Sequence, residues 1–371
     1  MKSRAAIVRT VPGHYEVVEV EVEDPRPGEI TVRMVASGLC LSDEHLTSGE
    51  LPAGILPMCG GHEGSGKVVA VGPGTFGFEI GDHVVLSATP ACGRCRYCAT
   101  GHQTLCDFSA KLLGGARFDE PGSYRMHYDG GPVGQWCGIS TFSEYSTVSI
   151  QSAVRIPKEM PLDRACLIGC GVNSGWGATV NSGQVKPGDT VIVMGCGGVG
   201  NFAVQGAAHA GALYVIACDP VASKREHAMA VGATHGSAGI EEAATLAREL
   251  TNGQGADCCA ITLGTMRPEH LQQAVAAVGR KGTVVCTAVG KSTDVDFKLS
   301  VFDLIVSQKR IQGSMAGAVS PTWDILKMIR LYQGGRLKLD SAITQTYSLD
   351  EINDGYRDLR SGKNIRGVIL F

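Results

Sequence analysis

No apolar run in this 371-residue chain is long enough to cross a membrane, and Met1–Arg9 lacks the apolar core of a signal peptide. Basic charge is not in excess: the formal net charge is −3, whereas a nucleic-acid-binding surface needs a basic face. No internal repeat is visible. We therefore expect a cytoplasmic protein whose partners include neither a membrane nor a nucleic acid.

Cysteine, by contrast, is abundant, with 14 residues. In a reducing cytoplasm these side chains are metal ligands or core residues rather than a disulfide framework. Apolar residues make up 44% of the chain and charged residues 19%, as in ordinary globular proteins. The length exceeds what one hydrophobic core usually serves, so two domains are expected.

The expected secondary structure changes along the chain. The first part has short β-strand patterns, and from Pro187 to about Gly290 apolar strands alternate with helical stretches. Such alternation is typical of a parallel sheet with helices on both faces. The end of the chain is helical and closes with a short strand. Representative predicted strands are Ile30–Val35, Gly66–Val71, Asp82–Ser87, Thr190–Met194, Tyr214–Cys218 and Val368–Phe371; predicted helices are Ala222–Val231, Glu241–Leu250, Trp323–Tyr332 and Leu349–Ser361.

A glycine-rich turn follows the strand Thr190–Met194 and opens a predicted helix. Its spacing is G-x-G-x-x-G, which lets a backbone approach a pyrophosphate at a helix N-terminus. Asp219 ends the next strand, where a carboxylate can bind ribose hydroxyls and would repel a 2′-phosphate, so NAD is favoured over NADP. Lys224 is either a further ribose contact or a solvated helix lysine, and a structural turn without ligand is the alternative for the whole motif. The turn residues are Gly195, Gly197, Gly198, Val199 and Gly200.

Four cysteines lie close together between Pro90 and Asp107: Cys92, Cys95, Cys98 and Cys106. Four thiolates can close a tetrahedral shell, which indicates a structural zinc site. An iron–sulfur cluster suits the same ligands, although the spacing before the last cysteine differs from the ferredoxin pattern. Reduced thiols without metal are the remaining alternative.

A second set of polar residues is dispersed along the chain. Taken singly, each has an ordinary structural explanation, such as a core cysteine, a surface histidine or a helix-capping serine. They are Cys40, Ser42, Asp43, His45, His62, Glu63 and Cys170.

Together these segments resemble the zinc-containing medium-chain alcohol dehydrogenases, in order and over nearly the whole chain. The matching blocks are GLCLSDEH, GGHEGSG, the four-cysteine lobe, STFSEY, GCGV, GCGGVG and LRSGKNIRGVILF. The resemblance implies an α/β fold: a doubly wound Rossmann sheet plus a β-rich, chaperonin-10-like (GroES-like) catalytic domain, with the active site between them. The expected boundaries are 1–171 for the catalytic domain with its zinc lobe at 90–107, 172–315 for the NAD-binding domain, and 316–371 for a return to the catalytic domain.

The resemblance also implies residue roles. Cys40, His62 and Cys170 are similar to catalytic zinc ligands, with water, substrate or Glu63 completing the shell, as three protein ligands and one exchangeable position require. The remaining implied roles are Asp43 as the carboxylate that orients His62, Ser42 and His45 as a proton relay, and Arg366 as a pyrophosphate ligand. Leu41 departs from the pattern, because several relatives have a basic residue there.

The implied reaction is reversible oxidation of primary alcohols to aldehydes by NAD, with two zinc ions per chain and a homo-oligomeric assembly. The most similar subgroup is the bacterial nicotinoprotein (dye-dependent) alcohol dehydrogenases, which keep NAD bound and pass electrons to an external acceptor. Small Ala88, with Trp136 and Cys137, suggests a pocket for medium, bulky or aromatic alcohols. We expect Phe108–Gly138 to form loops near the substrate entrance.

Three alternatives remain at this point. A glutathione- or mycothiol-dependent formaldehyde dehydrogenase is the nearest enzymatic one. A zinc-independent quinone or enoyl reductase would not need the cysteine and histidine ligands. A zinc-lobed, non-catalytic interaction protein would be expected to have lost an active-site ligand.

Overall fold

The computed structural model describes residues 1–291 and 294–371, and the chain divides into two compact units. The first unit comprises Met1–Cys170, Ser320–Gly334 and Leu339–Phe371, and the second comprises Gly171–Val319 and Gly335–Lys338. Within the described residues, no helix has the length and apolar character that a membrane crossing requires. Each unit has its own core.

The first unit is built mainly from antiparallel strands in two sheets. Its longest strand, β3 (Glu29–Gly38), pairs with β5 (Gly64–Val71) on one side and β18 (Arg366–Leu370) on the other. In the described part of the unit these belong to the sheet β10 (Ala153–Ile156), β6 (His83–Leu86), β5, β3, β18, β17 (Ile343–Tyr347), with β9 (Tyr145–Ser149) also on β3. A closed barrel is formed by β1 (Lys2–Val8), β2 (Glu16–Val22), β7 (Met126–Tyr128), β8 (Gly131–Gln135) and β4 (Met58–Cys59). In these two sheets β4 pairs parallel with β8, and β17 pairs parallel with β18.

The stretch Phe108–Gly138 is not all loop, so that part of the expectation is wrong. Met126–Tyr128 and Gly131–Gln135 are strands that pair antiparallel across the two-residue turn Asp129-Gly130. Both turn residues have positive φ, 51° and 75°, which a two-residue hairpin of this twist requires. The Asp-Gly pair was therefore a legible hairpin signal in the sequence.

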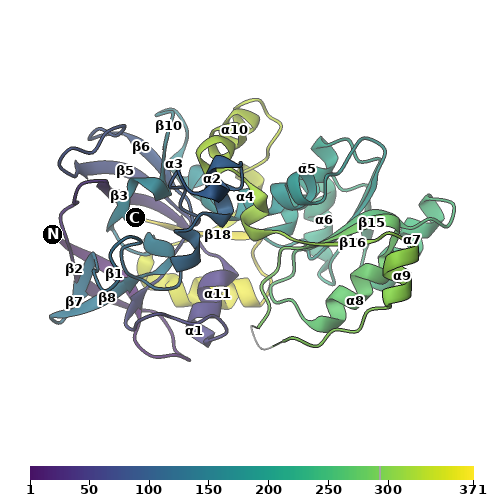
Figure 1. The fold of residues 1–371 in the computed structure, drawn as a ribbon, viewed down its shortest axis with the longest axis horizontal. Helices are drawn as coiled ribbons and strands as arrows, with labels where there is room; N and C mark the ends of the chain where they lie inside the picture. Colours follow the sequence, from purple (N-terminus) through teal and green to yellow (C-terminus); the bar gives the residue numbers. More distant parts are fainter. Residues whose placement is uncertain (292–293) are drawn as a thin grey trace. The chain divides into compact units, whose positions relative to one another are not determined.

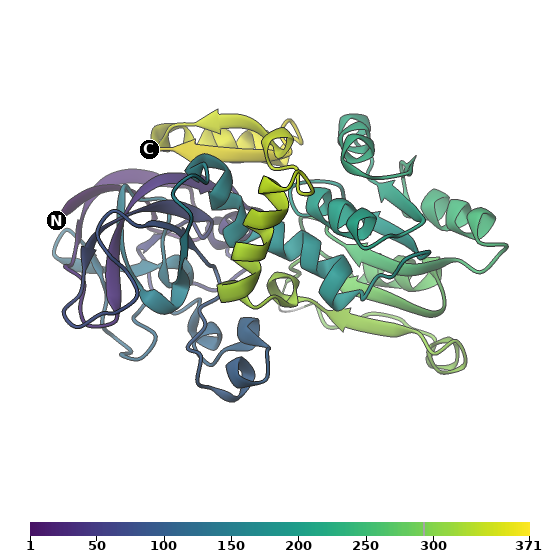
Figure 2. The ribbon, with the colours of Figure 1, turned by 90° about the horizontal axis from the view of Figure 1, so that it is seen from above.

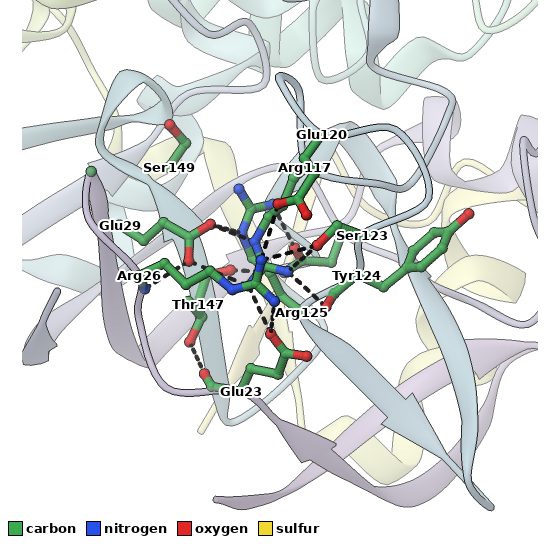
Figure 3. Close-up of polar contacts among 12 residues, drawn as sticks. Glu23, Arg26, Glu29, Arg117, Glu120, Ser123, Tyr124, Arg125, Thr147 and Ser149 are labelled. Carbon is green, nitrogen blue, oxygen red and sulfur yellow. Dashed lines mark hydrogen bonds and ion pairs between the residues drawn. The ribbon is translucent and has the colours of Figure 1, made fainter.

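A buried ion network fastens the segment before this hairpin to β3 (Figure 3). The Nε atoms of Arg117 and Arg125 donate to the same Glu29 oxygen, at 2.9 and 2.7 Å. Arg117 also donates to Glu23 at 2.8 Å, and Arg125 donates to the side chain of Gln135 at 3.1 Å. Buried charges persist only when they are paired and hydrogen-bonded, so each member depends on the others.

The end of the chain completes the first unit. Helix α11 (Ile352–Arg360) contacts β18, and both are drawn in yellow beside β17 in Figure 2. Its residue Tyr356 packs on Tyr15 and Phe142 in the core of the unit. Helix α10 (Pro321–Gln333) also belongs to this unit, and Ser320 at its start donates to the carbonyl of Gly101.

The second unit is a parallel sheet covered on both faces, as Figure 1 shows for its teal and green segment. Over the described residues the strand order is β13 (His235–Ser237), β12 (Tyr214–Cys218), β11 (Thr190–Met194), β14 (Ala256–Ile261), β15 (Val278–Cys286), β16 (Arg310–Gly313). Counted from β11, this is the order 3-2-1-4-5-6 of the Rossmann fold. Helices α5 (Gly200–His209) and α6 (Ala222–Val231) pack on one face, and α7 (Ile240–Leu250) and α8 (Pro268–Ala277) pack on the other.

Candidate metal centre and nucleotide site

Strand pairing in the first unit brings three distant segments to one point. Ser37 of β3 lies opposite Gly64 of β5, and Gly38 lies opposite Val368 of β18. The residues just outside these pairs are Cys40 after β3, His62 and Glu63 before β5, and Arg366 at the start of β18. A backbone hydrogen bond from Ala88 to Gly169, 3.3 Å long, brings the segment before Cys170 to the end of β6.

The result is a buried group of metal-ligand type. Each of Cys40, His62, Glu63 and Cys170 offers one ligand atom, and these four atoms lie within 4.8 Å of one another. Two sulfurs, one imidazole and a carboxylate are the donors that zinc takes in proteins. The four residues that the sequence placed together by resemblance thus meet in one unit.

Asp43 holds His62 from behind. Its Oδ1 accepts a hydrogen bond from the ring Nδ1 of His62 at 2.8 Å and another from the backbone of Gly61 at 3.0 Å. Because a carboxylate only accepts, Nδ1 bears the hydrogen and Nε2 is left with its lone pair. This orientation is the one in which a histidine offers Nε2 to a metal.

The electrostatics of the group favour positive charge at its centre. A hydrogen bond from the Cys170 thiol lowers the pKa of Cys40 well below that of an ordinary thiol, although burial acts against it. Burial also opposes a charge on the His62 ring, but the negative charges of Asp43, Cys170 and Cys40 together outweigh burial and raise the pKa of His62 well above its usual value. A divalent cation could replace the protons that the Cys40 thiol and Nε2 of the His62 ring would otherwise hold, so the residues present fit a zinc ion.

Glu63 forms a buried ion pair with Arg366. Burial raises the pKa of Glu63 to about 7, while the Arg366 charge works in the other direction. Gly38 makes room for this pair, because a Cβ at that position would collide with the Glu63 carboxylate. Glu63 therefore has a stable partner within the unit besides any metal.

The two residues predicted as a proton relay lie on helix α1 (Leu41–Ser48). The Ser42 hydroxyl is 3.7 Å from the Cys40 thiol, and Cys40 rather than Ser42 occupies the position that caps the helix. His45 is buried three residues further on, and its ring Nδ1 contacts the carboxylate of Glu50. Glu50 was not predicted from the sequence.

The four cysteines of the lobe also converge. One sulfur each from Cys92, Cys95, Cys98 and Cys106 lies within 4.8 Å of the others. Backbone N–H groups point at the sulfurs: Cys92 donates to Cys106 and Cys95 donates to Cys92, both at 3.3 Å. Hydrogen bonding from the Cys98 backbone lowers the pKa of Cys95 to about 6, which favours a thiolate. In Figure 2 the lobe appears in blue as short turns outside the strands of its unit.

The glycine turn of the second unit joins β11 to α5. A Cβ on Gly200 would meet the carbonyl oxygen of Gly195 at 1.8 Å, so strand and helix approach too closely for any side chain there. Around Gly197 the space is open, and the nearest atom to a Cβ is the Lys224 amine at 4.0 Å. Gly198 and Val199 complete the half-exposed part of the turn. An open cradle at a helix N-terminus with a cation beside it fits an anionic group such as a pyrophosphate.

Asp219 follows β12 and faces the turn. Its Oδ2 accepts from the backbone N–H of Cys196 at 2.8 Å, and its Oδ1 accepts from Val221 at 2.9 Å. The carboxylate is therefore fixed by the backbone on both sides. The Lys224 amine lies beside the open space at Gly197, and its contact with a ribose stays a prediction.

Three further residues were predicted to line a substrate pocket. Ala88 follows β6, and Trp136 and Cys137 form a short turn after β8; all three are buried. Burial raises the pKa of Cys137 to about 12; the His62 charge lowers it slightly and the Asp43 charge raises it slightly, so the Cys137 thiol lies near the metal-ligand group. Cys137 thus belongs to the surroundings of that group, while Trp136 is a buried residue of the core.

Known proteins match both units. A family model described as "Alcohol dehydrogenase GroES-like domain" matches residues 26–158, and one described as "Zinc-binding dehydrogenase" matches residues 198–333. NDMA-dependent alcohol dehydrogenase of Amycolatopsis methanolica is 46% identical over 370 residues, covering 100% of this chain and 99% of that protein. S-(hydroxymethyl)glutathione dehydrogenase of a Synechocystis species is 33% identical with 100% of both chains covered. The crystal structure of benzyl alcohol dehydrogenase from Acinetobacter calcoaceticus has a TM-score of 0.92 and 30% identity, covering 100% of this chain and 99% of that one.

A GroES-like unit and a Rossmann unit in one chain define the medium-chain dehydrogenases and reductases. Within that class, the chain belongs to the zinc-dependent alcohol dehydrogenases. It is thus an enzyme, and the alternative of a non-catalytic interaction protein is excluded.

Proposed function

We propose that this enzyme oxidises primary alcohols to aldehydes, reversibly, with NAD as hydride acceptor and a zinc ion held by Cys40, His62 and Cys170. The observation that supports this proposal best is the buried set of ligand atoms within 4.8 Å of one another. Zinc bound there would act as a Lewis acid on the alcohol oxygen, while NAD would accept the hydride.

The protein side of this chemistry is orientation. Asp43 keeps Nε2 of His62 available to a metal, and the pair of Glu63 with Arg366 leaves the fourth position to water or substrate. Glu63 is proposed as an occasional occupant of that position, and Arg366 stays a proposed pyrophosphate ligand by resemblance alone.

A second zinc ion is proposed in the four-cysteine lobe, with a structural role. Four thiolates leave no exchangeable position, and the N–H groups aimed at the sulfurs stabilise their negative charge. An iron–sulfur cluster is the alternative that metal analysis distinguishes.

NAD is proposed to bind the second unit at the turn of Gly195, Gly197, Gly198, Val199 and Gly200. The open space at Gly197 and the Lys224 amine suit the pyrophosphate, and the Asp219 carboxylate suits the ribose hydroxyls and disfavours a 2′-phosphate.

Ser42 and His45 are proposed to conduct the alcohol proton to solvent, because both hydroxyl and imidazole can accept and donate.

The cofactor is further proposed to stay bound through turnover and to pass its electrons to an external acceptor. Supporting this is the 46% identity with a relative named for its dependence on NDMA.

For the substrate, the small side chain of Ala88 leaves space for bulky or aromatic primary alcohols, and a structural neighbour is named a benzyl alcohol dehydrogenase. Oxidation of a thiol adduct of formaldehyde is the alternative, supported by the 33% identical relative.

The experiment is an alcohol panel assayed with free NAD and, separately, with NDMA. Protein purified without added cofactor should release NAD on denaturation, contain two zinc ions per chain, and prefer benzyl or hexyl alcohol to ethanol in kcat/KM. A higher kcat/KM for ethanol would refute the pocket assignment, and protein without NAD would refute cofactor retention. Turnover of formaldehyde that requires glutathione or mycothiol would favour the alternative.

Finally, we propose that two copies of the chain associate through strand β16. All of its residues are exposed, so its backbone edge is available for pairing. Helix α9 (Val301–Val306) is also apolar and exposed, with Phe302 at 76% and Val301 at 67%. A symmetric partner would cover both features by the same contact.

A further inference from the structure

His45 and Glu50 form a hydrogen-bonded pair at the end of helix α1. The ring Nδ1 of His45 contacts the Glu50 carboxylate, and the two side chains are 7% and 27% exposed. A carboxylate can only accept a hydrogen bond, so Nδ1 carries the hydrogen. In the neutral ring this leaves Nε2 as the acceptor.

The local chain geometry explains why two residues five positions apart meet. Helix α1 ends at Ser48, and Gly49 adopts a left-handed conformation with φ 81°, its N–H bonded to the carbonyl of Leu46. The chain then folds back, and the N–H of Leu51 bonds to the carbonyl of His45 at 3.0 Å. A Cβ on Gly49 would also lie 2.6 Å from the Val11 side chain. Glycine at this position therefore places Glu50 against His45.

The other charged side chains of this helix are committed elsewhere. Glu44 pairs with Arg360 of α11, and Asp43 is bonded to His62. Glu50 is thus the carboxylate that orients the His45 ring.

We propose that Glu50 is a positioning residue of the proton relay, which fixes His45 as the Nδ1–H tautomer and presents Nε2 to the incoming proton. This inference rests on the proposed function, in which His45 passes the alcohol proton to solvent. In each turnover the proton binds the lone pair of Nε2 and then leaves from Nε2 to water. The Nδ1 hydrogen stays with Glu50 throughout.

The first test reads the tautomer directly. In protein labelled with ¹⁵N-histidine, the His45→Gln variant identifies the His45 signals by their loss. Neutral His45 should show a protonated Nδ1 and an unprotonated Nε2 in the wild type and in Glu50→Gln, whose amide oxygen still accepts. Glu50→Ala should give a mixture of tautomers. A wild-type ring protonated at Nε2, or a Glu50→Ala spectrum identical to wild type, would overturn the proposal.

The second test is kinetic and uses the holoenzyme with its preferred alcohol. Glu50→Ala should lower kcat roughly 10-fold to 100-fold, by analogy with removal of the partner that orients a metal-bound histidine, with KM little changed. Glu50→Gln should keep most of kcat. Glu44→Gln, which removes a carboxylate charge from the same helix, is the matched control and should turn over normally. Equal kcat values for Glu50→Ala and wild type would contradict the positioning role.

The His45→Gln variant distinguishes the role of Glu50 from the proposed role of His45 in the proton relay. If His45 belongs to the relay, its loss slows turnover mainly at low pH, where the alcohol proton is hardest to remove. A His45→Gln profile that matches wild type would remove the relay itself. A slowed His45→Gln together with a normal Glu50→Ala would reject the role of Glu50 alone.

Discussion

Asp43 is fully buried, and one of its carboxylate oxygens accepts hydrogen bonds from the His62 ring and the Gly61 backbone. Its second oxygen is buried among the described residues without a hydrogen-bond partner. Burying a carboxylate in this way is costly, and the hydrogen bonds from His62 and Gly61 offset part of that cost. In the proposed metal centre the charge of Asp43 would also orient His62 and compensate the zinc ion.

We therefore predict that Asp43→Asn binds zinc about 10-fold more weakly at the Cys40, His62 and Cys170 site, because the negative charge behind the His62 ring is lost. The measurement is zinc retention against a chelator, together with kcat. Asp354→Asn, at an exposed position, is the control and should behave as wild type. Unchanged zinc retention in Asp43→Asn would show that the carboxylate does not support the metal.

For single residues, the sequence predicts well which residues belong to the candidate site. It predicts poorly which side chains contact one another. Cys40, His62 and Cys170 were identifiable because the motifs around them resemble a family, whereas nothing in their spacing brings them together; strand pairing does that. Glu50 was missed, although Gly49 after a short helix signals a chain reversal that returns the next side chain to the last turn. Similarly, the commitment of Arg366 to Glu63 depends on β18 lying beside β3.

Among the elements, the segment before hairpin β7–β8 is tied to β3 by charged side chains. Burial alone would raise the pKa of Glu29, but the nearby charge of Arg125 and the hydrogen bond from Arg117 outweigh it, and the pKa is lowered. A carboxyl group with a lowered folded-state pKa stabilises the fold above its unfolded pKa and loses that contribution as pH falls through the folded value. The network should therefore weaken in acid.

Glu29→Gln should lower the free energy of unfolding at pH 7 by about 3 kcal/mol, since it leaves Arg117 and Arg125 without their shared partner. The difference from wild type should shrink at a pH below the folded pKa of Glu29, where the wild-type group is also neutral. Denaturant unfolding at both pH values measures this. Glu120→Gln, at the exposed end of the same network, should change stability very little. A difference that is independent of pH would argue that packing, not charge, sets the effect.

Predictions of elements succeeded where periodicity was strong. Thr190–Met194, Tyr214–Cys218 and Ala222–Val231 occur as predicted, because buried parallel strands and amphipathic helices leave clear patterns. Strands β7 and β8 are short, and Pro132 and two glycines interrupt their apolar pattern. The Asp-Gly turn between them was a local signal of the hairpin, but the place of the hairpin in the barrel depends on distant strands that no local pattern encodes.

For the molecule as a whole, helix α9 leaves several neighbouring apolar side chains exposed, Val301, Phe302, Ile305 and Val306. Phe302→Asp should shift the enzyme to a smaller assembly in size-exclusion chromatography with light scattering, because a charge would be buried at the proposed contact. Phe76→Asp changes an even more exposed phenylalanine, at 87%, in the first unit and serves as control. If both variants keep the wild-type mass, β16 and α9 are not where the copies meet.

The hydrogen bond from the Cys196 backbone to Asp219 also bears on how this enzyme could evolve or be re-engineered. The carboxylate proposed to select the cofactor is also a brace for the loop proposed to cradle the cofactor's phosphates. Replacing Asp219 with a small neutral residue to admit a 2′-phosphate would also remove this hydrogen bond, and the loop would be held less firmly. A change of cofactor preference from NAD to NADP would therefore need a second, compensating substitution in the loop. Two substitutions, rather than one, separate the two preferences.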